Sequence, residues 1–62
     1  MKKPNPKYNE PPVYHVNHVY ESALYAAKAT DIESGIHILE QSLEAWPDIR
    51  DREIEKLRKE MS

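Results

Sequence analysis

The chain lacks several residue types on which small proteins depend for stability or for chemistry. Its 62 residues include no cysteine, no phenylalanine, one glycine and one tryptophan. Without cysteine the chain has neither a disulfide nor a thiol nucleophile. One glycine is too few for a glycine-rich phosphate loop, and the serines lie in no nucleophile-elbow motif. These absences predict a protein that is not an enzyme and has no cofactor.

Charge and hydropathy argue against further classes of protein, namely those that bind nucleic acid, span a membrane or carry a secretory signal. The net charge is -2, whereas a nucleic-acid-binding domain usually carries a basic face. No apolar run approaches the ~20 residues of a membrane span. Lys2 and Lys3 are followed by no apolar segment of the kind that a secretory signal contains. The sequence therefore predicts a cytoplasmic protein that binds neither nucleic acid nor membrane.

The length limits stability. A chain of 62 residues is one domain at most, and a domain of this size buries only about 60% of the surface that its unfolded form exposes. Because no disulfide is possible, the remaining source of stability is association with another chain. We therefore expect a homodimer.

Residues 30–47 carry the clearest helical pattern in the chain. Thr30 and Glu33 have the spacing of a capping box, which predicts the helix start, and Pro47 is expected to end the helix. Gly35 lies beside the apolar side, where a missing side chain predicts close contact with the helix that precedes it in the chain. The apolar side recurs at steps of three and four residues: Ile32, Ile36, Leu39, Leu43 and Trp46.

A first helix is predicted before this one, at residues 13–29. A strand over residues 13–19 is the alternative, but an isolated strand leaves its backbone unpaired, so we predict a helix. Its outer side carries Tyr14, His18 and Tyr25, which either contact a partner or are covered by the N-terminal segment. Its broad apolar face consists of Val13, Val16, Val19, Tyr20, Ala23, Leu24, Ala26 and Ala27.

The two ends of the chain complete the predicted fold. Residues 1–12 contain four of the five prolines and are predicted to form an extended arm. At its end, residues 11–14 resemble the PPxY ligand of WW domains, but the favoured interpretation is that Pro11 and Pro12 begin the first helix. Residues 48–61 predict a third, charged helix with a narrow apolar seam. The expected fold is all-α: an antiparallel helical hairpin plus a charged capping helix, over residues 13–62.

The spacing of Gly35, Leu39, Ser42 and Pro47 resembles the second half of a tetratricopeptide repeat, and Ala23 occupies the position of that repeat's small residue in the first helix. Two departures stand out, because Val19 replaces the usual tryptophan and Ala26 the usual tyrosine. Any tight helical hairpin produces similar spacing, which is the alternative. The resemblance covers about half of the chain and one repeat, and such repeats usually need about three copies.

The resemblance implies a protein-interaction module whose groove is lined by the first helix. The set of basic residues and asparagines that clamps a peptide carboxylate in some members is missing, so an apolar partner or self-association is implied instead. In a homodimer, Val16, Tyr20 and Leu24 would pack against their own copies. The predicted protein-binding residues are Val16, Tyr20, Leu24, Tyr14, His18 and Tyr25.

Histidines suggest a second function. His15 and His18 are three residues apart and, with Glu21, could hold a divalent metal in a regulatory protein. A zinc site needs three or four ligands, and the remaining histidine, His37, lies on another predicted helix. Surface histidines without a metal are the simpler interpretation, and we predict no metal site.

Overall fold

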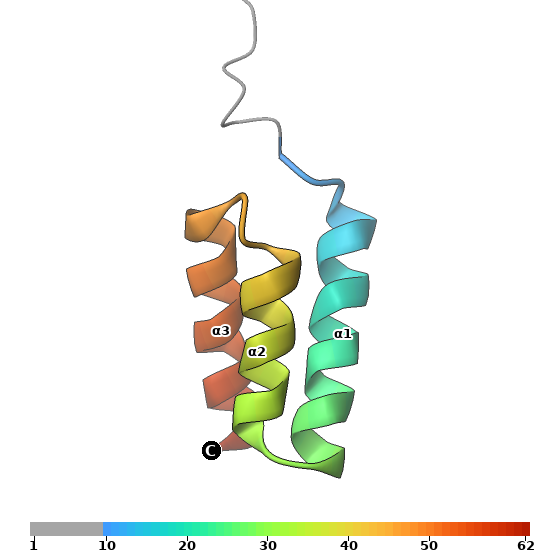
Figure 1. Cartoon of the computed structure of the whole chain (residues 1–62), viewed down its shortest axis with the longest axis vertical. Coiled ribbons are helices and arrows are strands. Elements are labelled where there is room, and N and C mark those ends of the chain that lie inside the picture. Colours follow the sequence, from blue (N-terminus) through green and yellow to red (C-terminus); the bar gives the residue numbers. More distant parts are fainter. Residues whose placement is uncertain (1–9) are drawn as a thin grey trace, which may run out of the picture.

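The computed structural model describes residues 10–62, which form an all-α fold with no strand in that range. The elements are α1 (Val13–Ala29), α2 (Ile32–Ser42) and α3 (Pro47–Met61). α1 and α3 run in one direction and α2 runs in the other, so the chain passes up and down along one axis (Figure 1). The predicted hairpin with a third helix is confirmed. Most of the predicted arm, residues 1–9, lies outside the described residues.

α1 has the predicted bounds, and the alternative of a strand at its start is wrong. Pro12 precedes the helix, and its carbonyl oxygen accepts hydrogen bonds from the backbone N–H groups of His15 and Val16, at 3.0 and 3.1 Å. Proline suits this position because the first N–H groups of a helix have no partner inside the helix. Tyr14 is therefore helical, and the extended form that a PPxY ligand requires is absent.

The joint between α1 and α2 differs from the predicted capping box. Thr30 belongs to the end of α1, since its backbone N–H donates to the Ala26 carbonyl at 2.9 Å. Asp31 is the N-cap of α2, with extended backbone. Its carboxylate accepts hydrogen bonds from the Ser34 N–H at 2.9 Å and from the Ser34 hydroxyl at 2.8 Å. One residue separates the expected cap from the real one, because Thr30, the first candidate, is the C-cap of α1.

We expect Asp31→Ala to lower the melting temperature by a few degrees, because α2 loses its N-cap. Thr30→Ala is the matched control and should change the melting temperature little.

The pKa of the Asp31 carboxyl lies below its ordinary 3.8, mainly because of the hydrogen bond from the Ser34 backbone N–H and also because of the one from the Ser34 hydroxyl. The cap's contribution should thus be complete above about pH 4 and be lost as the pH falls through the lowered pKa. Thermal melts of both variants between pH 2 and 7 measure this, and equal losses would contradict the assignment of the cap.

α2 ends earlier than predicted. It stops at Ser42, and the Leu43 N–H still donates to the Leu39 carbonyl at 3.0 Å before the chain turns. Pro47 does not terminate α2 but occupies the first turn of α3, with Trp46 as the preceding cap residue. A proline is tolerated at either place for the same reason, namely its missing N–H.

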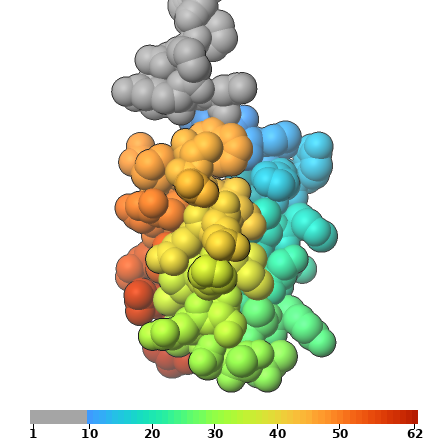
Figure 2. Space-filling view, in the orientation of Figure 1, coloured from blue at the N-terminus to red at the C-terminus, as the bar shows by residue number. Residues whose placement is uncertain are grey.

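The core lies along the line where all three helices meet. The completely buried residues are Leu39 of α2, Leu43 at the C-cap of α2, Leu57 of α3 and Ala23 of α1. α2 lies between α1 and α3 on the face that Figure 2 shows, and all three pairs of helices are in contact. The partly buried residues around this core are Leu24, Ile32, Ile36, Ile38, Trp46, Ile49, Ile54 and Met61.

Gly35 lies in close contact with α1, as predicted. A Cβ atom there would lie 2.5 Å from the Ala23 carbonyl oxygen, 2.9 Å from Leu57 Cδ2 and 3.0 Å from Ala27 Cβ. The α2 backbone therefore touches both α1 and α3 at this residue. Ser42, another small residue of the tetratricopeptide-like spacing, is exposed.

Candidate protein-binding surface

α1 carries the most exposed large apolar side chains of residues 10–62. Tyr14 is 76% exposed, and Tyr25 and Val13 are each 75% exposed. His18, between the tyrosines, is also exposed. α1 forms one edge of the bundle, with α2 and α3 on its other side (Figure 1). At about 100° per residue, Tyr14, His18 and Tyr25 fall within an arc of about 40°, so they form one row along the helix.

The other predicted binding residues face inward. Val16 and Tyr20 are buried and Leu24 is partly buried within the same chain. Tyr20 belongs to the core cluster, and Lys56 of α3 lies over its ring. Little of Val16 or Tyr20 is left for a partner, and the candidate surface therefore consists of Tyr14, His18 and Tyr25, which we call the outer face of α1.

A cation from α3 covers Tyr20. The Lys56 Nζ lies 4.4 Å from the centre of the Tyr20 ring, a distance at which an ammonium group is attracted to the ring face. Burial raises the pKa of the Tyr20 phenol, and the negative charges of Glu60 and Glu53 raise it further. The third helix therefore covers more of α1 than its narrow apolar seam predicted.

Glu53 is a buried acid that the sequence interpretation missed. The residue is only 3% exposed. The Oε2 atom lies 3.5 Å from Arg52 Nε, and Oε1 lies 3.7 Å from Lys56 Nζ. These distances exceed those of good hydrogen bonds, and Oε1 has no hydrogen-bond partner within residues 10–62. The spacing of Ile49, Glu53 and Leu57 at four residues was the available signal, because it places the acid in the apolar seam.

We expect Glu53→Met to raise the free energy of unfolding by about 1 kcal/mol, because a buried oxygen without a hydrogen bond is replaced by an apolar group of similar shape. Arg52 and Lys56 are largely exposed, so water can solvate them once the carboxylate is gone. Urea unfolding measures the change, with Glu55→Met at an exposed position of α3 as the control. A loss of stability confined to Glu53→Met would show that the two ion pairs outweigh the desolvation.

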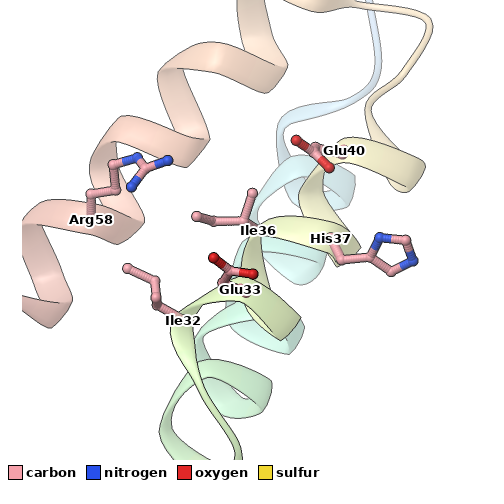
Figure 3. Close-up of a pocket in the computed structure, with 6 residues that line it drawn as sticks. All are labelled: Ile32, Glu33, Ile36, His37, Glu40 and Arg58. Carbon is pink, nitrogen blue, oxygen red and sulfur yellow. The ribbon is translucent and has the colours of Figure 1, made fainter.

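A shallow groove of about 360 Å³ lies between α2 and α3. In Figure 3, Ile32 and Ile36 point across it toward α3, from which Arg58 reaches back, whereas His37 points to the opposite side of α2. The groove thus combines half-buried isoleucines with a mixed set of charges. Its lining residues are Ile32, Glu33, Ile36, His37, Glu40 and Arg58.

The histidines occupy separate parts of the bundle. His15 and His18 are on α1, with His15 partly buried and His18 exposed, whereas His37 is on α2. Within the described range, no three side chains of His, Asp or Glu come close enough together to hold a metal ion.

Two further observations concern the chain as a whole. Over residues 10–62, none of the helices has the length and apolar character needed to cross a membrane. Comparisons of the chain with protein-family models, with curated proteins and with solved structures give no match. A functional assignment therefore depends on the residues and surfaces described above.

Proposed function

We propose that the chain is a small helical protein-interaction module, and not an enzyme, which binds its partner through the outer face of α1. One observation supports this most directly. Within residues 10–62, every large apolar side chain other than Val13, Tyr14 and Tyr25 is buried or partly buried. Two of these three, Tyr14 and Tyr25, lie on the outer face of α1, and exposed apolar side chains that share one face are typical of binding surfaces.

The identity of these side chains supports the same function. Tyrosine is enriched in protein interfaces because its ring supplies a large apolar area and its hydroxyl can hydrogen-bond at the rim. Tyrosine is also frequent among the few interface residues that contribute most of the binding free energy. The tetratricopeptide-like spacing around Gly35 belongs to the same proposal, since that repeat is also an interaction module.

The proposal is tested by capture from cells of the source organism with a tagged chain. Tyr14→Ala with Tyr25→Ala should lose a partner that the parent chain retains. The matched control changes two exposed residues on the other helices, Gln41→Ala with Glu55→Ala, and should retain it. Circular dichroism should show that both variants stay folded, since all four positions are exposed. Identical sets of captured proteins for parent and tyrosine variant would contradict the proposal.

A further inference from the structure

Four exposed residues of α1 follow one another with the spacing of a coiled-coil seam. Tyr14, His18, Glu21 and Tyr25 are separated by steps of four, three and four residues, and all four are exposed. This is the spacing at which side chains line the contact between two helices. They lie within an arc of about 60° and extend over about 16 Å of the helix. We call these four residues the outer seam.

The outer seam is complementary to itself when two copies run antiparallel. Its steps read the same from both ends, so Tyr14 opposes Tyr25 of a second copy at each end. In the middle, His18 of each copy opposes Glu21 of the other. In each end layer two aromatic rings meet, and their attraction adds to the free energy gained from the buried area. In each middle layer an imidazole meets a carboxylate.

A parallel arrangement of the same helices lacks this complementarity. It would set Glu21 against Glu21 and His18 against His18, and like charges at a contact disfavour it. Most soluble oligomers use a two-fold axis, across which one surface meets its own copy. The order of the four residues therefore favours a second copy of the chain in the antiparallel orientation.

We propose that a second copy of this chain occupies the outer seam, with the two α1 helices antiparallel about a two-fold axis and His18 paired with Glu21 of the second copy. This rests on the proposed function and names its partner. Burial of Val16 and Tyr20 within one chain moves the contact to the outer seam, away from the inner residues that the sequence suggested.

The area of the contact predicts a weak dimer. A tyrosine buries at most about 150–250 Å², and the dimer has four of them over about three helical turns. Such a contact falls near or below the ~1,200 Å² at which stable interfaces begin. We therefore expect a reversible dimer whose fraction rises with protein concentration into the high micromolar range.

Cysteine pairs test the register, because the chain has no cysteine of its own. A His18→Cys chain is mixed with a Glu21→Cys chain and oxidised gently. In the proposed register the two thiols face each other, and the mixed dimer keeps one His18–Glu21 pair. Each variant alone places its cysteine opposite a residue that is not cysteine. The matched control mixes His37→Cys with Glu40→Cys, which are exposed and have the same spacing on α2.

The mixed disulfide should form several-fold more than the disulfide of either variant alone, as measured by mass spectrometry, whereas the control mixture should show no preference. Adding Tyr25→Ala to both chains should remove the preference. Sedimentation of the parent chain should show dimer at high micromolar concentration. Disulfides within each single variant as the main product, or no preference in the mixture, would overturn the register. A parent chain that stays monomeric at every concentration would overturn the dimer.

These outcomes are separate from the test of the proposed function. A partner captured in a tyrosine-dependent manner, without the mixed disulfide, would leave the outer face of α1 as a binding surface for a different protein. Capture and cross-linking that are both insensitive to the tyrosines would end both proposals.

Discussion

Gly35→Ala should destabilise the domain by about 2 kcal/mol, although alanine is the better helix former by about 1 kcal/mol. The added Cβ would lie 2.5 Å from the Ala23 carbonyl oxygen, which is backbone inside α1, and 2.9 Å from Leu57 Cδ2. A helix carbonyl cannot yield without moving α1 away, and overpacking of this kind typically costs about 1–3 kcal/mol or more. The steric effect should therefore exceed the gain in helix propensity. Urea unfolding measures the difference.

Ser42→Ala is the control for this experiment. It places alanine in the same helix at an exposed position, where only helix propensity changes, and should leave stability equal or slightly higher. A Gly35→Ala chain at least as stable as the parent would mean that α2 does not approach α1 as closely as described.

Leu39→Ala should remove much of the domain's stability. Leu39 is completely buried at the centre of the core, and truncation of such a leucine costs about 2–5 kcal/mol because a cavity remains. A protein of this length has roughly 3–9 kcal/mol in total. We expect a large fall in the melting temperature, followed by circular dichroism, and partial unfolding at 37 °C.

Ile38→Ala provides the comparison for Leu39. It also removes a branched apolar side chain from α2, at the neighbouring and only partly buried position. Its effect should be about half as large or less, since less surface returns to water. Equal effects at the two positions would show that Leu39 is not the centre of the core.

The features that the sequence predicts well are those that depend on nearby residues. The bounds of α1 follow from Pro12 and from a long helical period, and the role of Gly35 follows from the absence of a side chain beside an apolar stripe. Leu39 and Leu43 are buried as their spacing indicates. In each case the signal in the sequence lies within a few residues of the feature that it predicts.

The errors concern choices between neighbouring residues of similar chemistry. Thr30 and Asp31 can both cap a helix, and the outcome depends on how far α1 continues. Pro47 can follow one helix or begin the next. Sequence spacing is the same for either choice, so packing of the helices selects between them.

The candidate site shows the same division. Tyr14, His18 and Tyr25 are exposed because they lie opposite the apolar face of α1, which the helical period reveals. The burial of Tyr20 depends on the path of α3 across α1, which helical period alone does not specify. The sequence interpretation does not place Glu53 in the core, because charged residues are rarely buried, and its burial is evident only with α3 in place.

The attachment of α3 has a consequence for the motions of the molecule. α3 shares fewer contacts with α1 and α2 than these two share with each other, and Leu57 is its one completely buried apolar residue among those described. Regions held by few buried contacts open at lower free energy than the rest of a protein. The amide hydrogens of α3 should therefore exchange with solvent sooner than those around Ala23 and Leu39, and each opening would briefly uncover the ring of Tyr20.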